Sequence, residues 1–384
     1  MNLVQKLWER GRSLLPGEGF SFDRPLLLLQ SDDWGRVGLR TPEVLDQLQS
    51  AGVTLGERPY DFYSLETAED VFALARLLKG HRDRTGRTAC ITINFVMANL
   101  DFAKMAAREF QQIHLRPLYD GLPEGWERAG LFEAYREGVE AGVFFPALHG
   151  LTHFCRAAVE NELAYAGERS ELVKILWRAG IPYIHWRMPW IGYEYWDPAR
   201  SSKDRFLSAS VQHELIGTAV GNFAKMFATL PRSACAPGYR ANQDTHRAWA
   251  HYGVRVAQNG PGSPKPPHFD ASGVLNLFRT LDFEPALNSE LAIEDLVSTI
   301  GESFAIGMPA IVSIHSINFH STIRDFRSRT LEMLDELLSA VEAQHPDLLY
   351  LHDGDVYDLV QSGCYANDST TVSVGVTKRS FSRA

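Results

Sequence analysis

The sequence has few cysteines, no long apolar run and no excess of positive charge, and each shortage excludes a class of protein. Its four cysteines are far apart and form no Cys-x-x-Cys pair, which argues against a disulfide framework and a structural zinc site. No window approaches the roughly 18 consecutive apolar residues that cross a bilayer. Lys and Arg total 38 against 47 Asp and Glu, so we expect no nucleic-acid partner.

The first 24 residues also lack the uninterrupted apolar stretch of a secretory signal, because Lys6, Glu9, Arg10 and Arg12 interrupt it. We therefore expect a cytoplasmic protein whose residues 1–24 form a helical segment packed on its own domain. The alternative is that residues 1–15 form a basic amphipathic helix on a membrane surface.

Hydrophobic residues make up 45% of the 384 residues and charged residues 22%, which is ordinary for a globular protein. Short apolar runs of strand length recur and alternate with helical patterns. The expected strands are 25–30, 88–96, 143–148, 234–237, 254–257, 274–279, 310–315 and 348–352. The expected helices include 41–50, 160–179, 244–252, 290–306 and 326–343. This alternation predicts a parallel sheet closed into a distorted (β/α)7–8 barrel.

No linker-like stretch divides the chain, so we expect a single barrel domain over residues 25–362. Three stretches interrupt its alternation, near 55–87, 103–128 and 181–231, and the first two are expected to lie over the barrel mouth. Residues 363–384 are rich in Ser and Thr and are expected to form a peripheral tail. No Gly-x-Gly-x-x-Gly or P-loop motif follows the first strand, which counts against a nucleotide-binding fold.

Polar side chains follow several of the predicted strands, at the ends where α/β barrels place their active sites. Asp32 and Asp33 follow the first strand, and His149 and His153 follow the third. A Pro-Gly-Tyr-Arg segment, residues 237–240, follows a middle strand, and His315 ends a late one. Each of these motifs is weak alone, because an aspartate pair can cap a helix and thirteen histidines produce such spacings by chance. Their combination is what indicates a site.

One carboxylate and two imidazoles supply three ligands and leave a fourth position for water, which is typical of catalytic rather than structural zinc. The second aspartate could then take a proton from the attacking water, and a histidine on the opposite side could donate one to a leaving group. The set predicts metal-assisted hydrolysis of a carbonyl compound.

The order of these motifs resembles the polysaccharide deacetylase family, the NodB-homology domain. The resemblance implies that Asp32 is the general base, that Asp33, His149 and His153 hold one divalent metal ion, expected to be zinc, and that His315 is the general acid. It also implies a distorted (β/α) barrel of the glycoside hydrolase/deacetylase type. The implied reaction removes N-acetyl or O-acetyl groups from an amino sugar, a glycan or a glycan precursor.

The resemblance covers roughly residues 26–360 and departs from the family pattern at two places. Trp34 stands between the aspartate pair and Gly35, where it could reshape the pocket. Cys235 stands where the family carries an arginine that holds the base, so we expect Arg240 or Arg187 to replace it. A backbone N–H near Tyr239 is expected to hold the oxyanion. The expected substrate-binding or supporting residues are Trp34, Pro237, Tyr239, Arg240 and Asn318.

Two other functions remain open. The same barrel and residues could serve a metal-dependent amidohydrolase that acts on a non-sugar amide. Cys235 in place of arginine leaves room for a catalytically inactive, glycan-binding member of the family. A glycoside hydrolase is disfavoured because adjacent aspartates in an extended strand point in opposite directions and no second acid stands out.

Overall fold

The computed structural model describes residues 17–165, 167–185, 188–261, 265–367 and 370–381. Its centre is a ring of parallel strands, so the predicted distorted barrel is confirmed. The strands are apolar and buried on both faces, as parallel strands covered by helices should be. In order around the ring they are β2 (Leu26–Trp34), β3 (Ile91–Phe95), β6 (Phe144–Leu148), β7 (Ser233–Cys235), β8 (Val256–Asn259), β10 (Leu275–Phe278), β11 (Leu281–Asp282) and β12 (Ala310–His315).

A single bent strand closes this ring. β10 pairs with β8 and β11 pairs with β12, and only Arg279 and Thr280 separate the two pieces. The Arg279 amide donates to the Asn259 carbonyl at 3.1 Å, and the Thr280 amide donates to the Ile311 carbonyl at 2.8 Å. Counted over the described residues, the ring therefore has seven strands, and β13 (Leu349–Tyr350) pairs with the start of β2.

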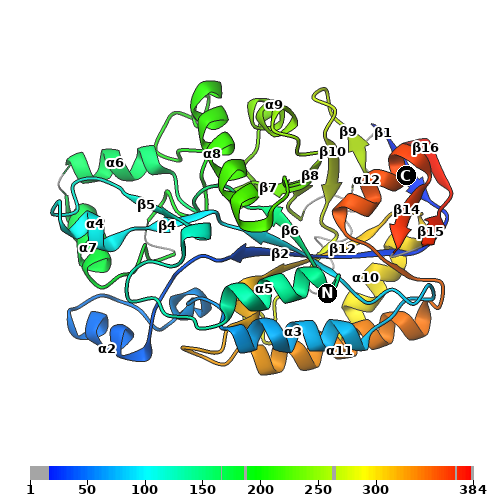
Figure 1. Ribbon diagram of the computed structural model, residues 1–384, viewed down its shortest axis with the longest axis horizontal. Coiled ribbons are helices and arrows are strands. Elements are labelled where there is room, and N and C mark those ends of the chain that lie inside the picture. Colours follow the sequence, from blue (N-terminus) through cyan, green and yellow to red (C-terminus); the bar gives the residue numbers. More distant parts are fainter. Residues whose placement is uncertain (1–16, 166, 186–187, 262–264, 368–369, 382–384) are drawn as a thin grey trace, which may run out of the picture.

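Helices surround the ring and bury their apolar faces against it in one large core. Figure 1 shows α3, α5 and α11 along one side of β2 and α8 and α9 on the opposite side. The wall and flanking helices are α2 (Pro42–Ser50), α3 (Ala68–Gly80), α5 (Leu131–Glu140), α8 (Ala209–Phe227), α9 (Gln243–His251), α10 (Ile293–Ala305), α11 (Arg327–Gln344) and α12 (Asp353–Ser362).

The carboxyl end of the ring, on the left in Figure 1, carries further short strands and helices. They are η1 (Pro59–Phe62), β4 (Ala98–Leu100), α4 (Phe102–Ala106), β5 (Leu115–Pro117), η2 (Leu118–Asp120), α6 (Arg156–Tyr165), α7 (Glu168–Arg178), η3 (Pro237–Tyr239) and η4 (Ser316–Phe319). The structure corrects two expectations. The stretch 55–87 contains α3, which packs in the barrel wall against α5, and the helix expected over 160–179 is two helices, α6 and α7.

The opposite end of the ring is closed by the two ends of the described chain. β1 (Gly17–Phe22) pairs antiparallel with β16 (Val376–Phe381), and β14 (Cys364–Asn367) pairs with β15 (Thr370–Ser373). β9 (His268–Phe269) joins the sheet beside β10. Residues 17–22, expected to be helical, are thus a strand, while residues 1–16 lie outside the described residues. The expected peripheral tail buries Tyr365 and Val374 in a second apolar cluster.

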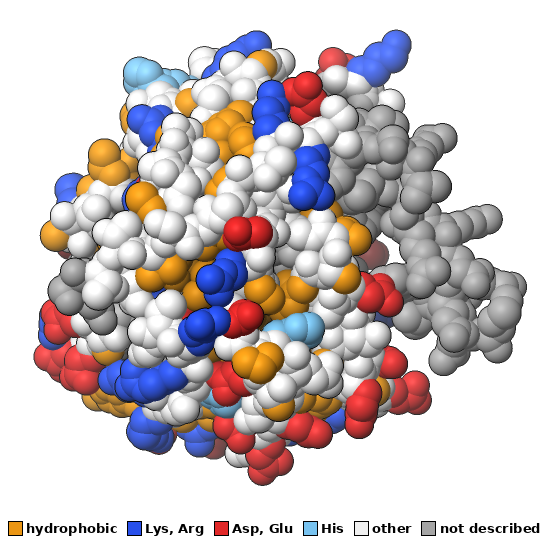
Figure 2. All heavy atoms as spheres, turned by 90° about the vertical axis from the view of Figure 1, so that its right-hand side faces the viewer, with side chains coloured by type: hydrophobic (Ala, Val, Ile, Leu, Met, Phe, Trp, Pro, Cys, Tyr) orange, Lys and Arg blue, Asp and Glu red, His pale blue; other side chains and the backbone are white. Residues whose placement is uncertain are grey.

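Figure 2 shows this closed end of the molecule. Acidic side chains gather towards its lower edge, whereas Lys and Arg side chains are scattered among apolar ones. Among the helices that the structure describes, none has the length and apolarity needed to cross a membrane.

Candidate active site

The two adjacent aspartates lie in a β-bulge at the end of β2. Between Ser31 and Trp34 the strand holds two residues where β3 holds one, and Asp33 has a φ of 75°. The Tyr63 hydroxyl donates to the Asp33 carbonyl at 2.7 Å and fixes this unusual backbone. A bulge redirects a side chain, so Asp32 and Asp33 escape the alternation expected of an extended strand. Both are only 1% exposed, and they contribute to two buried clusters that share His149.

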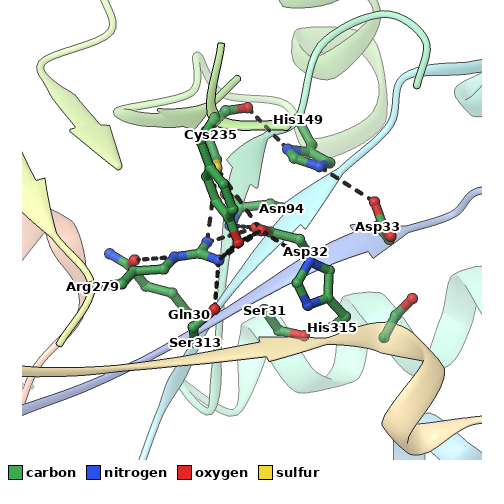
Figure 3. Close-up of polar contacts among 12 residues, drawn as sticks. Gln30, Ser31, Asp32, Asp33, Asn94, His149, Cys235, Arg279, Ser313 and His315 are labelled. Carbon is green, nitrogen blue, oxygen red and sulfur yellow. Dashed lines mark hydrogen bonds and ion pairs between the residues drawn. The ribbon is translucent and has the colours of Figure 1, made fainter. Parts of the chain in front are cut away.

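Arg279 holds Asp32 from inside the barrel, as Figure 3 shows. Its guanidinium makes a two-pronged contact with the carboxylate, at 2.6 Å to Oδ2 and 2.7 Å to Oδ1. Asn94 donates to Oδ1 at 2.8 Å and the Tyr239 hydroxyl to Oδ2 at 3.2 Å. Burial alone would raise the pKa of Asp32, but the charge and hydrogen bonds of Arg279 outweigh it and hold the pKa well below its usual range. Asp32 is therefore ionised at neutral pH.

Arg279 takes the part that the sequence assigned to Arg240 or Arg187. Arg240 instead lies over the Trp196 ring, 5.3 Å from its centre, and Arg187 lies outside the described residues. Cys235 is buried beside the arginine, with Sγ 3.8 Å from a guanidinium nitrogen. The sequence carried a signal for Arg279, because it is a charged residue at the carboxyl end of an expected strand, 274–279.

The second cluster is formed by Asp33, His149 and His153, whose candidate ligand atoms all lie within 4.8 Å of one another. Asp33 Oδ1 is 2.9 Å from His153 Nε2 and 3.4 Å from His149 Nε2. Despite this approach, Oδ1 is buried and has no hydrogen-bond partner among the described residues. His149 Nδ1 lies 2.9 Å from the Cys235 carbonyl, which can only accept, so Nδ1 carries a proton and Nε2 is the nitrogen that faces Asp33 and can bind a metal.

This donor set fits a divalent metal ion. The buried Asp33 oxygen without a hydrogen-bond partner lies within 4.8 Å of a ligand nitrogen on each histidine, and a carboxylate with two imidazoles suits zinc and its neighbours. Burial lowers the pKa of His153 to about 4 against the opposing charge of Asp33, so the imidazole is neutral at pH 7. A neutral imidazole is the form that binds metal.

His315 approaches the cluster from the end of β12, on the opposite side of Asp32 from Arg279 (Figure 3). Its Nε2 is 3.9 Å from Asp32 Oδ2, and its Nδ1 is 2.6 Å from Glu284 Oε1. Burial alone would lower the pKa of His315, but the Glu284 carboxylate outweighs it and raises the pKa to about 9. Asn318 donates to Glu284 at 2.5 Å and so acts through that residue. Glu284 lies in no motif, so no sequence signal indicated its part in the site.

Two of the other expected residues, Trp34 and Pro237, are buried, and Tyr239 uses its backbone N–H within the turn. Trp34 is fully buried and packs against Tyr135 and Phe319 in the core. Pro237 is buried at the start of η3. The backbone N–H of Tyr239 itself donates to the Ala236 carbonyl at 2.8 Å, so the expectation that an N–H near Tyr239 holds the oxyanion stays a prediction for its neighbours.

A buried carboxylate shapes the loop between the two histidines. Glu194 accepts hydrogen bonds from the amides of Leu151 and Thr152, at 3.0 and 2.8 Å. Burial raises its pKa to about 7. Gly150 packs against this carboxylate with a φ of 76°, a conformation that favours glycine.

We expect Gly150→Ala to lower the free energy of unfolding by about 1–3 kcal/mol from backbone strain alone, and further because its Cβ would collide with Glu194. Gly142→Ala is the matched control, since Gly142 has a φ of 68° but nothing within 4 Å of the added Cβ. Urea denaturation of both variants measures the difference. Equal destabilisation would show that Glu194 does not constrain the loop.

Comparisons with known proteins find likeness only among solved structures. No family model and no curated protein matches the chain. A protein named as a polysaccharide deacetylase from Mycobacterium smegmatis is 14% identical over 91% of this chain and 95% of its own, with a TM-score of 0.48. A family 4 carbohydrate esterase from Streptomyces lividans is 10% identical over 86% and 94%, with a TM-score of 0.35. Puue allantoinase is 11% identical over 89% and 91%, with a TM-score of 0.44. The solved structures that this chain resembles thus include polysaccharide deacetylases, the family whose motifs its sequence resembles.

Proposed function

We propose that the chain is a cytoplasmic, metal-dependent hydrolase that removes an acetyl group, N-linked or O-linked, from an amino sugar or a glycan precursor. One observation carries this proposal. An ionised carboxylate, Asp32, and a cationic imidazole, His315, face each other across 3.9 Å beside the buried Asp33, His149 and His153 cluster. A base, an acid and a metal-ligand set within one small space are the parts that amide hydrolysis needs.

Each part has a defined task. Asp33, His149 and His153 would hold the ion, for which we propose zinc. When bound, such an ion polarises a carbonyl and lowers the pKa of water to about 7. Asp32 accepts the proton of the attacking water, and Arg279 keeps its carboxylate ionised and oriented. His315, protonated below about pH 9, donates a proton to the departing amine nitrogen. Glu284 holds the ring so that Nε2 faces the reaction centre.

The surroundings of His315 leave two substrate classes open. The Tyr60 ring, from η1, stacks on His185 at 4.4 Å and lies edge-on to His315 at 6.4 Å, so two loops meet beside the acid. A cavity of about 30 Å³ lies among Arg36, Tyr60 and His185, but none of the proposed metal ligands, base or acid lines it, so it does not measure the substrate site. A single acetylated sugar and a small non-sugar amide are both candidates. Acetate release from N-acetylated sugars compared with small linear and cyclic amides separates the two.

The first test is the metal content of the purified protein after dialysis, beside that of His153→Ala. We expect about one divalent ion per wild-type chain and a loss of that ion in the variant, because one of three ligands is gone. His213→Ala is the control, since this histidine is exposed on α8. A wild-type chain that takes up no metal on reconstitution would overturn the proposed mechanism.

A further inference from the structure

An arginine lies behind the proposed metal ligands. Arg36 is three residues after Asp33 and only 4% exposed, and its guanidinium is 3.1 Å from Asp33 Oδ2. It donates to the Tyr183 hydroxyl at 2.6 Å and lies over the Tyr63 ring at 4.0 Å. These contacts fix a permanent positive charge next to the site, because a guanidinium does not deprotonate in proteins.

Arg36 also contacts His153, at 2.9 Å from Nδ1. A guanidinium can only donate, so Nδ1 must be the acceptor, and the proton of the neutral ring is on Nε2. A histidine that binds a metal through Nε2 needs the opposite tautomer, with its proton on Nδ1 facing an acceptor. His149 meets this requirement through the Cys235 carbonyl, whereas His153 does not.

The balance of charges around the site also disfavours the binding of a cation. Asp33 is already paired with Arg36, Asp32 with Arg279, and Glu284 with His315. A divalent cation would therefore enter a site in which each carboxylate is already paired with a cationic side chain. It would also be repelled by the positive charge of Arg36. Electrostatic repulsion of this kind is strong in a buried site, where solvent screens little.

We propose that Arg36 is a built-in competitor of the metal ion, which restrains the affinity of the site. The inference rests on the proposed function only in taking Asp33, His149 and His153 as the ligands. Metal binding then breaks the Arg36–His153 hydrogen bond and moves the ring proton from Nε2 to Nδ1, with no net proton gained or lost. The site binds its ion more weakly than the three ligands alone would allow, while still retaining it through dialysis.

Arg36→Gln tests the competition directly. Glutamine removes the charge and offers an amide oxygen that can accept from Nδ1–H. We expect the Kd for Zn²⁺, measured by competition with a chelator, to fall about 10- to 100-fold, the usual size of effects from partners of metal ligands. Arg36→Lys keeps the charge and is expected to bind no more tightly than wild type. Arg240→Gln controls for the loss of a positive charge elsewhere near the barrel mouth.

A second measurement uses the wild-type chain, in case the variant does not fold. Nitrogen-15 NMR of labelled histidines, with His153→Gln for assignment, should show His153 protonated on Nε2 without metal and on Nδ1 with Zn²⁺. A metal-free ring protonated on Nδ1 overturns the inference. If wild type binds Zn²⁺ and Arg36→Gln binds no more tightly, the inference fails and the proposed function stands. If neither protein binds Zn²⁺, both fail.

Discussion

Replacing Arg279 with methionine is expected to lower the free energy of unfolding by about 3–5 kcal/mol, because it leaves a buried carboxylate without its counter-ion. Arg279 is buried and bonded on every nitrogen, to Asp32, Gln30, Gln258 and Ser313 among others. The side chain of Asp32 is 2% exposed, so water cannot replace the lost charge. Urea denaturation, monitored by circular dichroism, measures the change.

Two further variants isolate the cause. Arg240→Met removes an arginine that lies over an aromatic ring and, among the residues that the structure describes, pairs with no carboxylate, so we expect a much smaller loss of stability. Adding Asp32→Asn to Arg279→Met removes the uncompensated charge and should restore part of the stability. If the double variant is as unstable as the sum of both single variants, the ion pair is not the source of the effect.

Replacing His315 with glutamine is expected to lower kcat about 10²- to 10⁴-fold, the usual contribution of a general acid. Only the protonated form of His315 can donate a proton, so wild-type activity should fall as pH rises through about 9, the raised pKa of this residue. This fall is the alkaline limb of the pH profile. The variant should lack this alkaline limb while keeping its metal. The measurement is kcat against pH on the best substrate, together with metal content.

A substitution of Glu284 tests the assignment of His315 as the general acid without changing His315 itself. Glu284→Gln removes the carboxylate that raises the pKa of His315, so the alkaline limb should move to lower pH. His268→Gln is the control, since its ring contacts the Pro266 carbonyl and Phe278 instead of the site. An alkaline limb that survives in His315→Gln would assign the titration to another group.

The barrel and its main strands could be predicted from sequence because a parallel sheet covered by helices requires short, continuously apolar strands. The residues Asp32, Asp33, His149, His153 and His315 could be found for a related reason, since polar side chains directly after such strands are costly unless they serve a site. The bulge at Asp33 was beyond prediction, because its backbone depends on pairing with β3 and on the hydroxyl of Tyr63.

Residues that act through contacts distant in sequence were also missed. Arg279 is 247 positions from Asp32, and Glu284 is 31 positions from His315. Cys235 marked the place where an arginine was lacking, but only the folded ring shows that the bent strand of β10 and β11, separated from β7 by β8, brings a guanidinium to Asp32.

The pairing of β1 with β16 has a consequence for how the molecule comes apart. Gly17 faces Phe381 and Phe22 faces Val376, so each end of the described chain is held by the other. Detachment or proteolytic removal of β1 leaves β16 without its pairing strand, and the reverse also holds. Local unfolding of one of the two strands therefore destabilises the other. Because this seam lies at the closed end of the ring, such unzipping begins far from Asp32 and His315. We therefore expect local unfolding at the closed end of the barrel to precede any loss of the geometry of Asp32 and His315.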